Sequence, residues 1–304
     1  MTKTAWLFPG QGSQEVGMGW DLKDIPAAQI KFETADKILG WSILEVTGAN
    51  DEKLSRTLYT QPCLYVIESI FADLLVEKGY LPDLVAGHSL GEYAALYAAR
   101  VFDFETGLQL VKHRAQLMDS AAGGKMVAIV KFDRQQLENA IDKTADVVIA
   151  NDNSAAQVVI SGKPEAVDSI VSQIKAKRTV PLKVSGAFHS PLMSPAAEKF
   201  QLLLDSLPFN NAKIPVISNV EPSPTTEADQ LKQRLMEQMT GSVRWRETML
   251  KLPEIGISQI LEVGPGKVLT GLIKRTCPDL NGMNINSLDR LSVLPQELAA
   301  CQPS

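Results

Sequence analysis

Cysteine is scarce in this sequence. The three cysteines, Cys63, Cys277 and Cys301, are an odd number and show no metal-ligand spacing. A disulfide framework needs an even set of cysteines, and a structural zinc site needs closely spaced ligands. The sequence therefore predicts neither kind of site, and it favours the reducing environment of the cytoplasm.

An excess of positive charge and long apolar runs are also missing. The 304 residues carry a formal net charge of −5, which argues against nucleic acid or an anionic membrane as the main partner. No apolar stretch reaches the ~18 residues of a membrane span, and the apolar start is too short for a signal peptide. We therefore expect a globular, cytoplasmic monomer.

The spacing of apolar residues predicts an α/β fold. A strand at residues 4–8 is followed by helices at 24–39 and 61–79, and later strands are expected at 215–219 and 260–263. Between them the order changes to strand, helix, strand, strand, helix, strand, at residues 126–130, 134–143, 147–150, 157–162, 164–177 and 180–184. That βαββαβ order is ferredoxin-like. We expect an α/β-hydrolase-like core formed by residues 1–124 and 189–304, with a ferredoxin-like insert at residues 125–188.

The most informative motif is Gly-His-Ser-Leu-Gly at residues 87–91. An apolar segment leads into it and a helix-forming segment at residues 92–99 leaves it, which is the context of a nucleophile elbow. Ser89 would occupy the strained turn, and side chains at Gly87 or Gly91 would crowd it. The backbone N–H of Leu90, at the start of the helix, could bind an oxyanion. Gln11, in the loop after the first strand, is the natural second donor.

A serine hydroxyl needs a base, and histidine is the usual one. The chain has three histidines. His88 should point away from Ser89 across the turn, and His113 lies within a predicted helix. We therefore expect His189 to be the base. No acid between Ser89 and His189 is singled out as its orienting partner, so a backbone carbonyl is the alternative.

Arg114 lies on the apolar face of the helix predicted at residues 105–118. Two interpretations are open. Its stem could pack in the core while its head reaches solvent or a buried acid. Alternatively, its planar guanidinium could bind the free carboxylate of an acyl group in a bidentate way.

Several motifs, in order along the chain, resemble the malonyl-CoA:acyl carrier protein transacylases. They are residues 8–14 (FPGQGSQ), 60–62 (TQP), 87–93 (GHSLGEY), Arg114 with Met118, 159–162 (VISG), 188–190 (FHS) and 262–266 (EVGPG). The resemblance runs from residue 5 to about residue 275. Residues 60–65 and 101–107 look most like the discrete acyltransferases that serve polyketide synthases in trans.

The resemblance implies a role for each site residue. Ser89 would be the acylated nucleophile and His189 its general base and acid, while Gln11 and Leu90 donate backbone N–H groups to the oxyanion. Arg114 would bind the malonyl carboxylate. Supporting roles are implied for three more residues: Phe188 in malonyl selectivity, the main-chain carbonyl of Gln238 as the support of the histidine, and Gln61 in lining the site.

The implied reaction moves a malonyl group from malonyl-CoA to the phosphopantetheine thiol of an acyl carrier protein, for polyketide or fatty acid synthesis, without a metal or other cofactor. An acidic carrier protein, or a carrier domain of a polyketide synthase, would dock on basic residues near the cleft. The candidates are Lys163, Lys177, Arg178, Lys267, Lys274 and Arg275.

Two other functions compete with this interpretation. A proofreading hydrolase of the same fold would pass the acyl group to water, but acyl groups without a carboxylate would leave the Arg114 charge unpaired. A catalytically silent scaffold would bind carrier proteins, but it has no need of a serine, a histidine and an arginine together.

Overall fold

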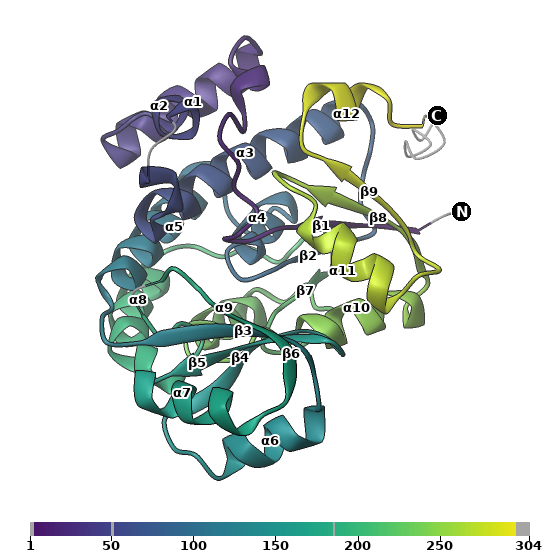
Figure 1. The fold of residues 1–304 in the computed structure, drawn as a ribbon. Coiled ribbons are helices and arrows are strands. Elements are labelled where there is room, and N and C mark those ends of the chain that lie inside the picture. Colours follow the sequence, from purple (N-terminus) through teal and green to yellow (C-terminus); the bar gives the residue numbers. More distant parts are fainter. Residues whose placement is uncertain (1–2, 50–51, 185, 296–304) are drawn as a thin grey trace.

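The computed structural model describes residues 3–49, 52–184 and 186–295. Its strands are β1 (Lys3–Phe8), β2 (Leu84–Gly87), β3 (Lys125–Phe132), β4 (Val147–Ser154), β5 (Gln157–Gly162), β6 (Ala176–Pro181), β7 (Val216–Ile217), β8 (Ile257–Val263) and β9 (Asn281–Ile285). They form a five-stranded sheet in the order β7-β2-β1-β8-β9 and a four-stranded sheet in the order β4-β5-β3-β6. Helices surround both sheets (Figure 1), which confirms the α/β class.

The helices connect these strands. They are α1 (Pro26–Leu39), α2 (Ile43–Gly48), α3 (Thr57–Glu77), α4 (Gly91–Ala98), α5 (Phe104–Ser120), α6 (Arg134–Asp142), α7 (Pro164–Gln173), α8 (Ser194–Ser206), α9 (Ala228–Glu237), α10 (Trp245–Glu254), α11 (Val268–Thr276) and α12 (Leu288–Ser292). Short 3-10 turns occur at Trp20–Leu22, Lys53–Ser55 and Pro191–Met193.

The larger sheet is parallel and buried on both faces. Along β1, Trp6 and Phe8 belong to the core that α3, α4 and α5 complete, whereas Ala5 and Leu7 belong to a second core with residues of α10 and α11. This alternation follows from the two-residue period of a strand. The register pairs Phe8 with Gly87 and Leu7 with Glu262. The carboxyl ends of β1, β2 and β8 therefore meet at one edge, where α/β folds place their sites.

The smaller sheet carries its helices on one face. Val127 and Ile129 of β3 pack with residues of α6 and α7, while Met126 and Ala128 face the large core. The observed order β3-α6-β4-β5-α7-β6 is the expected βαββαβ. Figure 1 shows α6 and α7 on the side of this sheet away from the larger one. Its inner face is therefore free to form one wall of a site.

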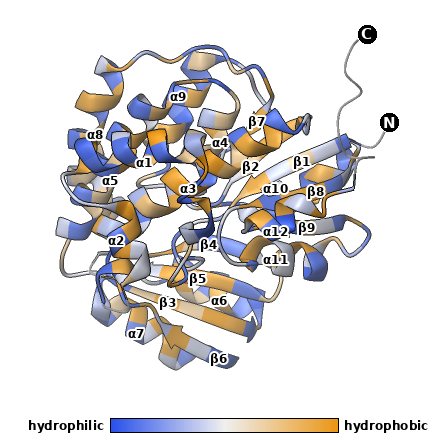
Figure 2. Ribbon diagram, turned by 90° about the horizontal axis from the view of Figure 1, so that it is seen from above, coloured by the Kyte–Doolittle hydropathy of each residue, from blue (hydrophilic) through white to orange (hydrophobic). Residues whose placement is uncertain are grey.

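The predicted ends of one helix and one strand in the smaller part of the chain are wrong. The helix expected at residues 164–177 stops at Gln173, and the strand expected at 180–184 lies at Ala176–Pro181. β6 is an edge strand with mostly exposed residues, and only part of it is coloured hydrophilic blue in Figure 2. Its position in the sheet is set by antiparallel pairing with β3, in a register that runs from Phe132 opposite Ala176 to Val127 opposite Pro181. An apolar pattern does not mark such a strand.

Smaller differences occur in the larger part of the chain. The helix expected at 24–39 begins at Pro26, whose fixed φ suits a first helical position, and the helix expected at 61–79 spans Thr57–Glu77. The strand expected at 215–219 has only two residues, Val216–Ile217. The chain leaves the sheet there, which lets Asn219 turn toward the elbow.

Candidate active site

Residues 87–91 form the sharp turn between β2 and α4. Ser89 has a φ of 52°, a left-handed conformation that is strained for a residue with a side chain. A Cβ atom at Gly87 would lie 1.9 Å from the carbonyl carbon of Gly91, and one at Gly91 would lie 2.1 Å from the carbonyl oxygen of Phe8. Both positions therefore require glycine, because the turn packs against itself and against the end of β1.

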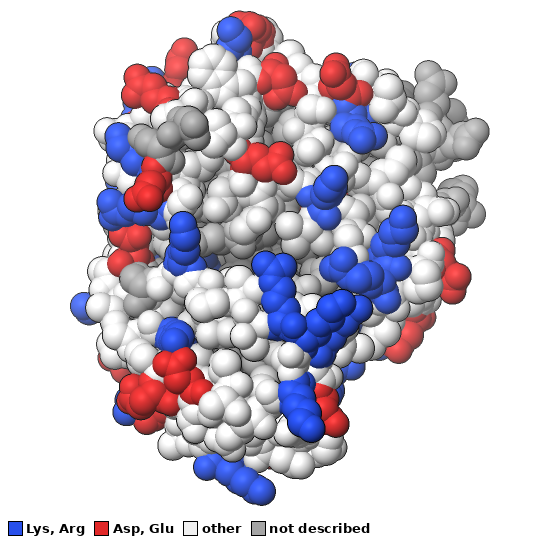
Figure 3. Space-filling view, in the orientation of Figure 1, with Lys and Arg blue, Asp and Glu red and all other residues white. Residues whose placement is uncertain are grey.

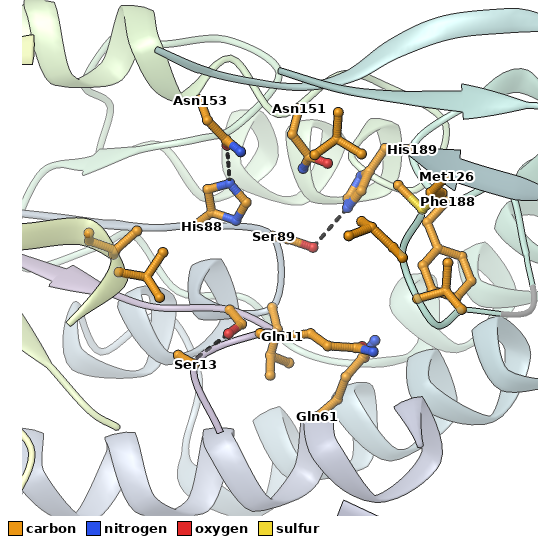
Figure 4. A pocket seen from close by; sticks show the side chains of 18 of the residues that line it. Gln11, Ser13, Gln61, His88, Ser89, Met126, Asn151, Asn153, Phe188 and His189 are labelled. Carbon is orange, nitrogen blue, oxygen red and sulfur yellow. Dashed lines mark hydrogen bonds between the residues drawn. The ribbon is translucent and has the colours of Figure 1, made fainter. Parts of the chain in front are cut away.

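His189 faces Ser89 across the cavity (Figure 4). Its Nε2 lies 2.8 Å from the Ser89 Oγ, and its Nδ1 lies 2.8 Å from the main-chain oxygen of Gln238. A carbonyl oxygen can only accept, so Nδ1 carries the proton and Nε2 is left to accept from the serine. Burial, with a further contribution from Arg114, lowers the pKa of His189 to about 3. The imidazole is therefore neutral and can act as a base.

Arg114 lies behind the serine and is fully buried. Its NH2 donates to the Ser89 Oγ at 3.1 Å and to the Gln238 Oε1 at 3.0 Å. Within the described chain its Nε and NH1 have no hydrogen-bond partner. The sequence left open whether this arginine is structural, reaching solvent or a buried acid, or binds the carboxylate of an acyl group. The structure places its NH2 beside the serine, while the guanidinium carbon lies 5.4 Å from the centre of the Tyr93 ring.

Gln238, just after α9, joins the three residues. Its main-chain oxygen accepts from His189 and its Oε1 accepts from Arg114. Its Nε2 donates to the main-chain oxygen of Ser89 at 2.9 Å and to the Glu92 Oε2 at 2.7 Å. Only the resemblance pointed to Gln238, because no local pattern marks a residue that acts from this distance in the sequence.

A cavity of about 210 Å³ opens beside Ser89. The loop after β1, the elbow, the inner face of the smaller sheet and the start of α11 line it, and residues 11, 61, 89, 90, 188 and 189 are all among its walls. Phe188 and Met126 lie on one side of His189 (Figure 4). His88 turns away from the serine toward Asn153, and the His88 Nε2 lies 2.8 Å from the Asn153 Oδ1.

The expected oxyanion-hole residues lie together. A Cβ at Gly10 would approach the His88 carbonyl oxygen to 2.4 Å, so the loop that carries Gln11 packs directly on the elbow that carries Leu90. The Gln11 side chain donates to the Thr57 Oγ1 at 3.2 Å, which turns it away from the serine. The Gln61 Nε2 lies 3.4 Å from the Met118 Sδ, and its buried Oε1 has no hydrogen-bond partner in the described chain.

Sequence reasoning missed Glu92 and Asn219. Both are buried and both contact the elbow: the Ser89 N–H donates to the Asn219 Oδ1, and the Asn219 N–H donates to the Glu92 Oε2. A signal was present at Glu92, which is an acid in a helix whose eight residues are all buried. Asn219 carried none, because it meets Ser89 from 130 residues away in the sequence.

Basic side chains gather beside the cleft. Figure 3 shows Lys and Arg over α11 and the neighbouring end of the smaller sheet. Five of the six candidates are exposed there on or next to α11 and β6, namely Lys177, Arg178, Lys267, Lys274 and Arg275. The sixth candidate, Lys163, lies 2.7 Å from Asp146, and this ion pair neutralises its charge locally.

The described residues form neither a metal site nor a membrane-spanning helix. No group of three or more histidine, cysteine, aspartate or glutamate side chains is placed to hold a metal ion. Among the described helices, none is both long and apolar enough to span a membrane.

Comparison with known proteins gives consistent matches. The acyl transferase domain family matches residues 5–294. The chain is 60% identical over 292 residues to the malonyl CoA-acyl carrier protein transacylase of Synechocystis sp., covering 96% of this chain and 100% of that protein. It is 43% identical over 286 residues to the polyketide biosynthesis malonyl CoA-acyl carrier protein transacylase PksC of Bacillus subtilis. This match covers 91% of this chain and 98% of that protein.

Solved structures agree. The crystal structure of the Synechocystis sp. PCC 6803 transacylase superposes with a TM-score of 0.95 at 59% identity, covering 96% of this chain and 100% of that one. A second solved structure shows a malonyl-transacylase, PlMCAT, in complex with the type II polyketide synthase acyl carrier protein AntF. It superposes with a TM-score of 0.90 at 37% identity, covering 96% of this chain and 98% of that one. The chain therefore belongs to the acyl transferase family, in its group of malonyl-CoA:acyl carrier protein transacylases.

Proposed function

We propose that this chain moves a malonyl group from malonyl-CoA to the phosphopantetheine thiol of an acyl carrier protein, through an ester on Ser89. One observation carries the proposal: the Ser89 Oγ lies between a neutral His189 and the NH2 of the buried Arg114, which donates to it. The first contact prepares a nucleophile, and the second prepares a site for a carboxylate. The family membership supports the same reaction.

The first half-reaction forms the malonyl ester. His189 Nε2 takes the Ser89 proton as Oγ attacks the thioester carbon, and the carbonyl oxygen becomes an oxyanion. The backbone N–H groups of Gln11 and Leu90 hold that oxyanion. When the carbon–sulfur bond breaks, His189 returns the proton to the sulfur, and CoA leaves as a thiol.

The second half-reaction runs the same steps in reverse with a new thiol. The phosphopantetheine thiol of the carrier gives its proton to His189, and its sulfur attacks the ester carbon. The carbon–oxygen bond to Ser89 breaks, and His189 returns the proton to Oγ. All of these steps use groups of this chain, the malonyl-CoA thioester and the carrier thiol.

Arg114 provides selectivity for a carboxylate. A malonyl carboxylate beside Ser89 would pair with the buried guanidinium charge, which NH2 brings to the serine. Phe188 and Gln61 line the cavity beside Ser89. The ring of Phe188 limits the room for an α-methyl branch, although the exclusion of one methyl group contributes only about 1–3 kcal/mol.

The experiment that tests this function is the intact mass of the protein after incubation with malonyl-CoA, followed by addition of a phosphopantetheinylated carrier protein. We expect the mass of one malonyl group on the enzyme, which then moves to the carrier. Release of free malonate without an adduct, or transfer to water that exceeds transfer to the carrier, would instead identify a hydrolase.

We propose further that the exposed basic residues on α11 and β6 form the docking surface for the carrier. Reversal of charge at Lys274 and Arg275 together should slow transfer from preformed malonyl-enzyme to an acidic carrier by about tenfold at low salt, and by less at high salt. The rate constant at each salt concentration is the measurement. Lys143→Glu, just after α6 at the far end of the smaller sheet, is the control, and an equal loss there would contradict this surface.

A further inference from the structure

The peptide group before Ser89 is held by one side chain. The Ser89 N–H donates to the Asn219 Oδ1 at 2.7 Å, and the Asn219 Nδ2 donates to the Gly87 carbonyl oxygen at 2.6 Å. The Asn219 amide therefore uses its acceptor and a donor on the two main-chain groups that flank His88, just before Ser89. Because Ser89 holds a strained φ of 52°, such a conformation persists only where its surroundings impose it.

The peptide group after Ser89 is held by a second amide. The Ser89 carbonyl oxygen accepts from the Gln238 Nε2 at 2.9 Å and from the Glu92 N–H at 3.2 Å. The same peptide group carries the Leu90 N–H, which points away from that oxygen because a peptide is planar and trans. A fixed oxygen thus fixes the direction of the proposed oxyanion donor.

One carboxylate oxygen joins the two amides. The Glu92 Oε2 accepts from the Asn219 N–H at 3.1 Å and from the Gln238 Nε2 at 2.7 Å. Glu92 comes from α4, Asn219 from the segment after β7 and Gln238 from the end of α9, and all three are at most 1% exposed. Burial raises the pKa of Glu92 to about 7, but Oε2 can accept these bonds with or without a proton on the other oxygen.

We propose that Asn219 and Glu92 are positioning residues for acyl transfer: Asn219 fixes the peptide before Ser89, and Glu92 anchors Asn219 and Gln238 to each other. This inference rests on the proposed acylation of Ser89. Neither residue is among those that line the cavity. Asn219 acts through Ser89 and Leu90, so its loss should lower the rate of acylation and leave the binding of malonyl-CoA almost unchanged. Glu92 also reaches Arg114 through Gln238, so the unchanged binding is a prediction for Asn219 alone.

The test is single-turnover acylation, followed by intact mass against malonyl-CoA concentration. Asn219→Leu keeps the approximate volume and removes both hydrogen bonds, and we expect acylation at saturation to slow by about 100-fold, as when one oxyanion donor is lost. The half-saturating malonyl-CoA concentration should stay within about twofold. Asn219→Asp keeps the acceptor for the Ser89 N–H and should fall between Asn219→Leu and the wild type.

Glu92 variants separate hydrogen bonding from charge. Glu92→Gln keeps an oxygen that can accept both bonds, so we expect an acylation rate within about threefold of the wild type. Glu92→Leu removes the acceptor and should slow acylation at least tenfold. If Glu92→Gln were as slow as Glu92→Leu, Glu92 would act through its charge, and the proposed anchoring would be overturned.

Controls distinguish the possible failures. Asn210→Leu removes a weaker 3.3 Å bond from another asparagine side chain to a main-chain oxygen, that of Val101, and should acylate like the wild type. If the wild type forms no ester, the proposed function fails. If the wild type forms the ester and a folded Asn219→Leu or Asn219→Asp forms it as fast, this inference is overturned. A rise in the half-saturating concentration without a fall in rate would overturn it too.

Discussion

Replacement of Ser89 by alanine is expected to abolish the malonyl adduct and to lower transfer to the carrier protein by on the order of 10⁵-fold. The reason is chemical: the Ser89 Oγ is the atom that His189 and Arg114 both contact, and without it no ester forms. Intact mass after incubation with malonyl-CoA measures the adduct, and a discontinuous transfer assay measures the remaining rate.

Ser161→Ala is the matched control for this prediction. Ser161 is also a fully buried serine, but its hydroxyl has no hydrogen-bond partner among the described residues, so its loss should leave the transfer rate unchanged. Persistent malonylation of Ser89→Ala would assign the nucleophile to another residue. Biological function that survives Ser89→Ala unchanged would favour a carrier-binding scaffold instead of an enzyme.

Replacement of Arg114 by methionine is expected to remove the preference for malonyl-CoA over acetyl-CoA. Without the guanidinium, the malonyl carboxylate would be buried and unpaired, which costs about 3–5 kcal/mol. That free energy corresponds to a loss of roughly 10²–10⁴-fold in the ratio of malonyl to acetyl acylation. The two acylation rates, measured by intact mass at equal thioester concentration, give the ratio directly.

Arg114→Lys is the informative comparison for this prediction. Lysine keeps the positive charge but has no planar fork, so we expect it to recover only part of the ratio. Arg114→Met removes a buried, incompletely bonded charge but leaves the buried Gln238 Oε1 without its donor, so a thermal melt of the variant accompanies the rate measurements. If Arg114→Met still preferred malonyl-CoA, Arg114 would be a structural residue and a hydrolase would become the better candidate.

Local sequence by itself determined much of this protein. The apolar run, the two glycines and the helix-forming segment around Ser89 predict the elbow, because a sharp turn has a local signature: a Cβ at Gly87 would meet Gly91, four residues on. Helical periodicity turns Arg114 inward for the same kind of reason: neighbours three and four residues apart share a face. The three histidines left His189 as the base by elimination, and its Nε2 lies 2.8 Å from the serine.

Only the tertiary structure decided how these parts meet. β6 is a strand because β3 offers it a pairing edge, not because its own residues are apolar. Gln238 and Asn219 reach the elbow from 149 and 130 residues away, and Glu92 joins them through one oxygen. Contacts between distant segments depend on how whole elements pack, and a short-range pattern carries no record of that packing. The sequence thus predicts the elbow and its serine, but not the distant residues that contact this turn.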